Sequence, residues 1–347
     1  MTLCPAIVLD AHGSVDVLET RDIDVPSPGP GQVRVRVRAV ALNHLDLWVR
    51  RGLPGLKLEY PHRLGSDIAG EVESVGAGVT NAQPGQKLLV APGTSCGVCE
   101  ACLSGDDNLC VKYRILGENT HGGYAQLLNI PAQNVLPFPS KLSFTEAAAI
   151  PLTFLTAWQM VVLRARVRPG EIVLVQGAGS GVGVAAIQIA RLHGARVWAA
   201  AGSPEKCERA RQLGAEEAFD HTKVDVNAEV KQRTGKRGVD VVIEHVGGDT
   251  FLKSVLATTR GGRVVTCGAT SGFNVDLDLR QVFFRQVQVL GSTMGPRGTL
   301  FDIVRHVEAG RLRPVVDRVL PITQAREAHR VLEAREAFGK VVLEHAS

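Results

Sequence analysis

The 347-residue sequence has no concentrated basic stripe, no low-complexity run and no signal-peptide pattern at its start. Its 39 Lys and Arg against 35 Asp and Glu leave a net charge of only +4, so nucleic acid is not expected as a partner. The first ten residues lack a basic start and a long apolar stretch, so export is not expected either. A composition of 45% hydrophobic and 21% charged residues excludes wholesale disorder, and the length suggests two domains.

One stretch could be mistaken for a membrane span. Residues 172–190 carry no charge over 19 positions, which is nearly enough to cross a bilayer. The same stretch contains four glycines, a serine and two glutamines, a composition that favours a buried strand, a glycine turn and a packed helix. We therefore expect no membrane association.

Cysteine is unevenly distributed, with four of the seven cysteines between positions 96 and 110. Cys96, Cys99, Cys102 and Cys110 follow the spacing C-x2-C-x2-C-x7-C. Four thiolates can surround Zn²⁺ at about 2.3 Å and leave no position for water or substrate, which predicts one structural zinc. An iron–sulfur cluster is the alternative. Clustered cysteines without an export signal indicate metal rather than disulfides, and a reducing cytoplasmic location.

The chain changes character near residue 150. Before it, alternation of Val33, Val35 and Val37 with arginines predicts a half-buried strand in a β-rich domain. After it, six strands alternate with helices, which predicts a doubly wound parallel sheet. The expected strands are 172–175, 196–201, 218–219, 239–244, 263–267 and 287–290. The tail has helices near 299–309 and 323–334 and a strand at 340–344, and it could complete the sheet domain or return to the first domain.

A glycine-rich turn, Gly177-Ala178-Gly179-Ser180-Gly181-Val182-Gly183, follows the first parallel strand and precedes a helix. Glycines in such a turn let backbone N–H groups approach a pyrophosphate at the helix N-terminus. The spacing is not a literal G-x-G-x-x-G, and a glycine turn that serves packing alone is the other interpretation. The strand–turn–helix context favours dinucleotide binding.

The end of the second parallel strand bears on which dinucleotide is bound. NAD sites usually place an acidic residue about 20 positions after the glycines, where it binds the ribose 2′-hydroxyl. Here the sequence reads Ala200-Ala201-Gly202-Ser203, and no acid occurs before Glu205. Ser203 and Lys206 could bind a 2′-phosphate, so we expect NADP(H), with NAD(H) possible. Ser203 could equally be only a helix cap, and Lys206 a solvated side chain.

Together these features resemble the medium-chain dehydrogenase/reductase superfamily over essentially the whole chain. Other matching segments are Asn43-His44-Leu45-Asp46, Gly65-Ser66-Asp67-Ile68-Ala69-Gly70, Gly122-Gly123-Tyr124-Ala125 and Thr156-Ala157-Trp158. The resemblance implies a GroES-like catalytic domain at 1–150 with a zinc lobe at 93–112, a Rossmann domain at 151–291, and a tail at 292–347 that returns to the catalytic domain. The active site would lie in the cleft between the domains. It further implies a homodimer or homotetramer, associated through the edge strand near 287–290.

The resemblance also assigns residues to the cofactor and the substrate. Thr156 would line the nicotinamide pocket, His221 would lie near the adenosine phosphate, and Gly268 and Ser292 would contact the cofactor. Asn43 would hydrogen-bond the acceptor oxygen, and Asp46 would act at the site or only fix the loop of Asn43. Trp48 and Tyr60 are candidates for the wall of the substrate cleft, although core packing also explains Trp48.

The departures from the zinc alcohol dehydrogenase branch concern its catalytic zinc. Where that branch has Cys, His-Glu and Cys, this chain has Asn43, Ser66-Asp67 and Leu152 or a neighbour. An amide, a hydroxyl and an alkyl group cannot replace two thiolates and an imidazole around Zn²⁺. An unorthodox site built from His44, His62, Asp67 and His121 matches no known metal spacing.

Loss of the catalytic zinc changes the expected reaction. Conjugated acceptors already spread the incoming negative charge onto oxygen and need mainly a nearby hydride donor. Asn43 and Asp46 look like the Asn-x-x-Asp of the ζ-crystallin-like quinone reductases, which also lack that zinc. We therefore expect an NADP(H)-preferring oxidoreductase that acts on a small-molecule quinone or conjugated carbonyl or alkene. A zinc alcohol dehydrogenase with altered ligands and a non-catalytic NADPH-binding protein are the alternatives.

Overall fold

The computed structural model describes residues 2–345, and the chain divides into two compact units. The first unit comprises Met1–Leu152 and Pro296–Ser347, and the second comprises Thr153–Gly295. Helix α4 (Pro151–Trp158) contains the passage from one unit to the other. No helix in the described part of the chain is long and apolar enough to span a bilayer.

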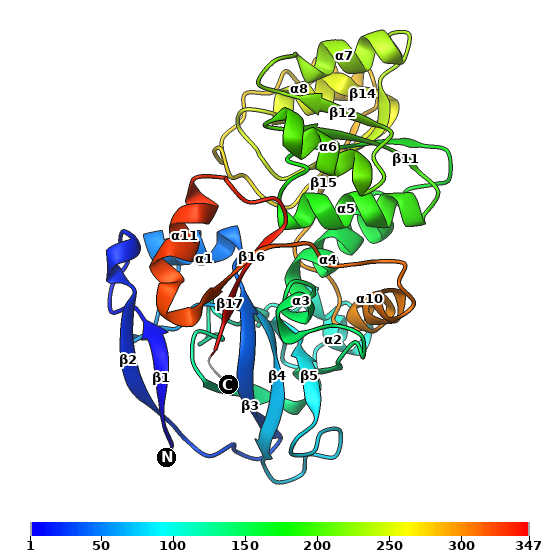
Figure 1. The fold of residues 1–347 in the computed structure, drawn as a ribbon. Helices are drawn as coiled ribbons and strands as arrows, with labels where there is room; N and C mark the ends of the chain where they lie inside the picture. The colour runs from blue at the N-terminus through cyan, green and yellow to red at the C-terminus, as the bar shows by residue number, and fades with distance from the viewer. Residues whose placement is uncertain (1, 346–347) are drawn as a thin grey trace. The chain divides into compact units, whose positions relative to one another are not determined.

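The first unit is built on a seven-stranded sheet with the order β16-β17-β3-β4-β5-β9, in which β8 also pairs with β3. Its strands are β3 (Gln32–Ala41), β4 (Asp67–Val75), β5 (Lys87–Val90), β8 (Leu127–Pro131), β9 (Val135–Pro137), β16 (Val316–Pro321) and β17 (Lys340–Glu344). Two short two-stranded sheets accompany it, β1 (Thr2–Val8) with β2 (Glu19–Val25) and β6 (Gly93–Thr94) with β7 (Arg114–Ile115). Strands β3, β4 and β5 lie side by side (Figure 1).

Short helices connect these strands. They are α1 (His44–Arg51), α2 (Glu100–Leu103), α3 (Phe144–Ala148), α10 (Thr299–Glu308) and α11 (Ala325–Glu333), with single 3₁₀ turns η1 (Val15–Val17), η2 (Asp107–Leu109), η3 (Ala132–Asn134) and η5 (Ile322–Gln324). The tail belongs to this unit, because β17 pairs antiparallel with β3 and β16 pairs parallel with β17. The alternative in which the tail completes the parallel sheet is therefore wrong.

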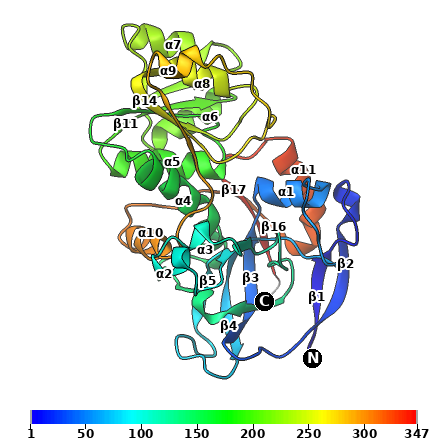
Figure 2. The ribbon, with the colours of Figure 1, turned by 180° about the vertical axis from the view of Figure 1, so that it is seen from behind.

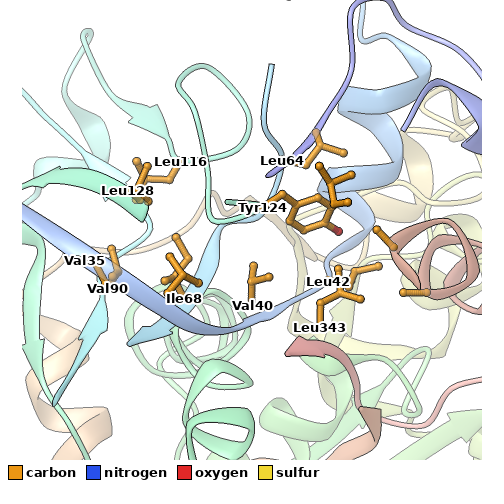
Figure 3. Close-up of a cluster of buried hydrophobic side chains, with 14 of the residues drawn as sticks. Val35, Val40, Leu42, Leu64, Ile68, Val90, Leu116, Tyr124, Leu128 and Leu343 are labelled. Carbon is orange, nitrogen blue, oxygen red and sulfur yellow. The ribbon is translucent and has the colours of Figure 1, made fainter. Parts of the chain in front are cut away.

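The core of the first unit is aliphatic and lies against β3 and β4. Val35, Val40 and Ile68 on these strands belong to one buried cluster with Tyr124 and Leu343 (Figure 3). Alternation along β3 buries Val33, Val35 and Val37 as predicted, but Arg34 between them is buried too. Its guanidinium donates to the carbonyls of Val25 and Pro26 and to Asn129, which compensates for its loss of water.

The second unit is a six-stranded parallel sheet with the order β12-β11-β10-β13-β14-β15. Its strands are β10 (Ile172–Val175), β11 (Arg196–Ala201), β12 (Glu217–Asp220), β13 (Val239–Glu244), β14 (Thr258–Thr266) and β15 (Gln288–Gly291). Its helices are α5 (Gly181–Leu192), α6 (Pro204–Gln212), α7 (Val226–Arg233), α8 (Phe251–Ala257), α9 (Arg280–Phe283) and the π-helical segment η4 (Gln159–Arg164). Helices α7 and α8 lie side by side in both views (Figures 1 and 2).

The two sheets confirm the predicted α/β architecture, a doubly wound parallel sheet in the second unit and a β-rich first unit. The uncharged stretch 172–190 forms strand β10, a glycine turn and most of helix α5. The strand order reverses between β10 and β13, and ligands of such sheets bind at the carboxyl ends of the strands near that point.

Candidate functional site

The four clustered cysteines meet in the first unit. Their Sγ atoms all lie within 4.8 Å of one another, with 3.5 Å between Cys99 and Cys102 and 3.6 Å between Cys110 and Cys96. A tetrahedron of sulfurs about 2.3 Å from a zinc ion has edges of about 3.8 Å, so the spacing fits that ion. Disulfide sulfurs lie only about 2.05 Å apart, and all seven cysteines are free thiols.

Backbone groups of the cysteine lobe favour the thiolate form of Cys96, whereas hydrogen bonds with the neighbouring thiols raise the pKa of Cys99 to about 11. The N–H groups of Val98 and Cys99 donate to Cys96 Sγ and lower the pKa of Cys96 to about 6. Gly97 and Gly105 adopt the left-handed backbone conformation, with φ of 74° and 91°, which allows the chain to fold tightly around the four sulfurs. The donor set and its geometry therefore fit a closed, structural metal site.

The predicted cofactor residues of the second unit gather along one edge of its sheet. Gly177 to Gly183 follow β10, Gly202, Ser203 and Lys206 follow β11, His221 follows β12, Gly268 follows β14 and Ser292 follows β15. The strands are parallel, so their carboxyl ends share that edge. Residues that are up to 115 positions apart in sequence thus come to the same side of one sheet.

The glycine turn forms a cradle that a side chain would fill. A Cβ on Gly183 would lie 2.5 Å from the carbonyl oxygen of Gly177, and Gly177 itself has a φ of 57°. Ser180 is the N-cap of α5, and its Oγ accepts from the N–H of Gly183 at 2.9 Å. The N–H groups at the start of α5 have no intrahelical acceptor and form an anion site with the helix dipole. The turn therefore fits a pyrophosphate.

The ends of β11 and β12 carry the residues predicted to bind the adenosine part of the cofactor, and no carboxylate directly follows β11. Ser203 is the N-cap of α6, and its Oγ accepts from the N–H of Lys206 at 3.2 Å, while its hydroxyl hydrogen remains a donor. Gly202 faces His221, whose Nε2 lies 3.3 Å from the place of a Cβ. Strand pairing brings Asp220 beside Ala201, but Asp220 Oδ1 already accepts from the N–H and the hydroxyl of Thr222.

A buried polar cluster in the first unit surrounds Asn43, and we call Asn43, Asp67 and Lys340 the lysine cluster. Lys340 Nζ donates to Asn43 Oδ1 at 2.6 Å and to Asp67 Oδ2 at 2.9 Å, and Asn43 Nδ2 donates to Asp67 Oδ2 at 3.0 Å. The side chain of Asp67 is fully buried, and that of Lys340 is 4% exposed. The N–H of Leu152 donates to Asp67 Oδ1 at 2.5 Å. The cluster thus contains its own cation.

Asp46 supports this cluster from the start of helix α1. Its Oδ2 accepts from the N–H of Asn43 at 2.7 Å and its Oδ1 from the N–H of Gly65 at 2.9 Å, so both oxygens are engaged with backbone. Burial raises the pKa of Asp46 to about 6, although these two N–H groups and Lys340 oppose the rise. The geometry suits an anchor for the Asn43 loop.

The positions where zinc alcohol dehydrogenases hold a catalytic metal offer poor ligands. Ser66 is fully buried, and its hydroxyl has no hydrogen-bond partner among the described residues. Asp67 pairs with Lys340, and His62 and His121 lie near each other with ring centroids 5.5 Å apart. Across residues 2–345, the four cysteines are the group of His, Cys, Asp or Glu side chains close enough to hold a metal. The four residues His44, His62, Asp67 and His121 do not form such a group.

The remaining predicted site residues are placed as follows. Thr156 lies on α4 and is 5% exposed. Trp48 is half-buried on α1, and Tyr60 is exposed. Ser292 is buried, with a hydroxyl that has no partner in the described part of the chain.

Two residues that sequence reasoning missed belong to these sites. Lys340 lies 297 positions after Asn43 and becomes its partner only when β17 pairs with β3. His245 follows β13, the one strand whose carboxyl end carried no predicted residue, and its Nε2 lies 3.2 Å from Ser180 Oγ. The rule that ligands bind at strand ends could have indicated His245, whereas no local signal indicates Lys340.

Two family models match the chain. Residues 29–140 match the alcohol dehydrogenase GroES-like domain, and residues 181–309 match the zinc-binding dehydrogenase model.

Similar proteins include both quinone and alcohol oxidoreductases. The quinone oxidoreductase of Sus scrofa is 31% identical over 347 residues, and the match covers 98% of each chain. An NAD-dependent alcohol dehydrogenase of Saccharolobus solfataricus is 31% identical over 337 residues, which is 94% of this chain and 96% of the relative. A crystal structure of an NAD-dependent alcohol dehydrogenase has 54% identity and a TM-score of 0.95, and covers 98% of this chain and 99% of its own.

Proposed function

This chain belongs to the medium-chain dehydrogenase/reductase superfamily of NAD(P)-dependent oxidoreductases. We propose that it uses NADPH to reduce quinones or other conjugated carbonyls and alkenes. In this proposal one structural zinc stabilises the cysteine lobe, and no metal takes part in hydride transfer. The substrate is a small molecule.

The lysine cluster is the observation that carries this proposal. A catalytic zinc supplies several kcal/mol by polarising a carbonyl oxygen. At the corresponding positions this chain has a buried ammonium group within 2.9 Å of the nearest carboxylate oxygen. A divalent ion beside Lys340 would meet a fixed positive charge, and the oxygens of Asp67 that could bind it already accept from Lys340, Asn43 and Leu152.

Reduction of a conjugated acceptor needs less charge stabilisation from the protein than oxidation of an alcohol does. The reduced nicotinamide, when bound, supplies a hydride. The acceptor gains that hydride and its two electrons, and a proton from solvent completes the hydroquinone or the saturated carbonyl compound. Asn43 Nδ2 directs one hydrogen to Asp67, while its other hydrogen has only a long contact of 3.5 Å to the carbonyl of Ala41. That hydrogen is available to an acceptor oxygen.

The remaining roles follow from position. Asp46 holds the backbone of Asn43 and Gly65, so we assign it a positioning role. Thr156 contributes to the nicotinamide pocket. The glycine turn holds the pyrophosphate, and Gly202, Ser203, Lys206 and His221 hold the adenosine end. Gly268 and Ser292 complete the cofactor site.

A substrate screen tests the reaction. Purified protein with NADPH is expected to reduce 1,4-benzoquinone or an enone, and the rate should survive dialysis against a chelator that leaves the lobe intact. Oxidation of ethanol or longer alcohols that exceeds quinone reduction, and that stops when a second zinc is removed, would contradict the proposal.

Alcohol dehydrogenase activity is the second candidate. It is favoured by the 54% identity to an NAD-dependent alcohol dehydrogenase structure. The two candidates differ in metal content, because a zinc-dependent alcohol oxidation needs two zinc ions per chain and our proposal needs one.

Cofactor preference rests on the adenosine end of the site. A 2′-phosphate meets no carboxylate directly after β11, and the hydroxyl of Ser203 can donate to it. We expect the kcat/KM for NADPH to exceed that for NADH, and Lys206→Ala to lower the NADPH value about tenfold while NADH changes little. A wild-type preference for NADH would contradict this assignment.

We also propose that the protein associates with a second copy. Strand β15 ends the parallel sheet, and Phe283, Phe284, Leu279 and Val289 near it are exposed. An open strand edge flanked by apolar side chains favours pairing with the same edge of another chain. Sedimentation should give a dimer or a tetramer, and Phe284→Ser should shift it toward monomer. The unpaired thiols further support a reducing compartment such as the cytoplasm.

A further inference from the structure

His245 occupies the centre of the cofactor edge in the second unit. It directly follows β13, which neighbours β10 at the point where the strand order reverses. Its side chain is 8% exposed, so it belongs to the interior of this edge rather than to the surface. The residue was not among the predicted cofactor residues, and its contacts give it a specific task.

The imidazole of His245 packs directly on the glycine turn. A Cβ on Gly177 would lie 2.7 Å from its Cε1, so the ring covers the space that a side chain at position 177 would take. Its Nε2 lies 3.2 Å from Ser180 Oγ. The same Oγ accepts from the N–H of Gly183 and caps helix α5. His245, Ser180 and Gly183 thus form one hydrogen-bonded chain beneath the pyrophosphate cradle.

The single hydroxyl hydrogen of Ser180 limits what this chain can do. When His245 Nε2 carries no hydrogen, it accepts that hydroxyl hydrogen, and Ser180 has no donor left for a ligand. When Nε2 carries a hydrogen, the ring donates to Ser180 Oγ, and the hydroxyl hydrogen can turn toward a phosphate oxygen. An anion in the cradle therefore favours the form of His245 with a hydrogen on Nε2.

We propose that His245 is a positioning residue for the dinucleotide: a hydrogen on its Nε2 frees the Ser180 hydroxyl to donate to the pyrophosphate, so binding of the cofactor is coupled to protonation at His245. The proposal rests on the dinucleotide site of the proposed function and deepens it.

The surroundings of His245 set the direction of the coupling. Burial lowers the pKa of His245, with Glu244 of β13 opposing the change, so the ring is neutral before a ligand binds. The carboxylate of Glu244 is engaged by the hydroxyls of Thr250 and Ser254 and by the N–H of Val246. Cys267 after β14 stays a neutral thiol because burial raises its pKa to about 12. The neighbours from β10 and α5, Gln176 and Ser180, carry no charge. The neutral ring has one hydrogen for its two nitrogens, whereas the protonated ring always carries one on Nε2, so affinity should rise as the pH falls.

Binding of NADPH in the absence of any acceptor tests this inference. Titrations followed by NADPH fluorescence should show wild-type affinity rising about tenfold from pH 8 to pH 6, the gain of one charge-assisted hydrogen bond from Ser180. In H245L no imidazole accepts the Ser180 hydroxyl hydrogen, so we expect this His-dependent pH profile to be absent. The variant H245Q carries an amide that can donate to Ser180 Oγ at every pH, and we expect its affinity to stay near that of wild type at pH 6 and to lose the same pH profile. The 2′-phosphate of NADPH also titrates near pH 6, so NADH serves as a second probe at every pH.

A double-variant cycle separates this role from simple packing. S180A removes the hydroxyl, so the pH profile that distinguishes His245 from H245L should be absent in the S180A background. His193→Gln, at the C-cap of α5 away from the turn, is the matched control and should bind like wild type.

Three results would overturn the inference. They are a wild-type pH profile retained in H245L, a difference in pH profile between His245 and H245L that persists in the S180A background, and a wild-type pH profile retained in H245Q. If H245L does not fold, the pH profile of H245Q by itself tests the inference. A wild-type protein that binds neither NADPH nor NADH would overturn the dinucleotide site as well, whereas inactivity toward every quinone would contradict the proposed substrate and leave this inference standing.

Discussion

The cysteine lobe and the lysine cluster belong to the same unit, but they differ in what balances their negative charge. The lobe brings four sulfurs within 4.8 Å of one another, and residues 96–110 include no Lys or Arg. The negative charge of four thiolates there would be balanced by a bound metal ion. The lysine cluster has one carboxylate, one amide and one ammonium, all hydrogen-bonded to each other. The comparison teaches that the chemistry of the donors, more than the fold around them, decides where this chain needs a metal.

The largest effect is expected where the ion is indispensable. Cys110→Ser removes one of four thiolates, and structural zinc in small sites contributes on the order of 10 kcal/mol of apparent binding free energy. We expect zinc content to fall from one per chain toward none and the thermal midpoint of unfolding to drop by more than ten degrees, roughly. Elemental analysis and calorimetry measure both.

Cys207→Ala, a buried cysteine of α6 outside the lobe, is the control and should keep its zinc. Full zinc content and an unchanged melting curve in Cys110→Ser would show that the lobe does not depend on the ion.

The lysine cluster should be broken by removing its internal cation. Lys340→Met leaves the carboxylate of Asp67 buried without a counter-charge, which typically costs about 3–5 kcal/mol. Adding Asp67→Asn removes the unpaired charge and should restore most of that free energy of unfolding. Urea unfolding of both variants measures the difference, with the exposed Lys141→Met as control. Equal stability of Lys340→Met and wild type would mean that the ammonium contributes nothing to this cluster.

A third buried polar group sharpens the comparison, because its charge depends on pH. His329 accepts from Arg50 Nη1 at Nδ1 and meets the hydroxyl of Tyr124 at Nε2, at 3.2 and 3.0 Å. Burial, followed by the charges of Arg50 and Arg51, lowers the pKa of His329 to about 3. The unfolded chain therefore binds one more proton than the folded chain between pH 6.5 and about 3, so stability falls as the pH falls through that window.

This pH effect is the smallest of the three. It amounts to at most about 1.4 kcal/mol per pH unit, or about 2 kcal/mol between pH 6.5 and 4.5. His329→Gln keeps an acceptor and a donor, and its free energy of unfolding should depend on pH with a slope shallower by one proton. Urea unfolding at a series of pH values measures the slope, and identical slopes in the two proteins would contradict the assignment.

Sequence reasoning succeeded where a feature is local. The cysteine spacing brought four sulfurs together because the residues lie within 15 positions, and the Rossmann strands followed from runs of buried apolar residues. It failed where partners come from distant strands. Lys340 meets Asn43 only through the pairing of β17 with β3, and His245 meets Ser180 only because β13 lies beside β10.

Burial of charge was also beyond sequence reasoning. Arg34 has the period of a solvent-facing residue in a half-buried strand, yet the carbonyls of Val25 and Pro26, at and just after the end of β2, accept from its guanidinium. A strand pattern shows which face a side chain takes, but not what the rest of the chain places over that face.

The central claim of the proposed function is that Asp67 is paired with Lys340 and not with a metal ion. Anomalous diffraction at the zinc absorption edge, on crystals of protein expressed with added zinc, tests it most directly. We predict one peak per chain, centred among the sulfurs of Cys96, Cys99, Cys102 and Cys110. A second strong peak beside Asn43, Ser66 and Leu152 would contradict the account and favour alcohol–aldehyde interconversion.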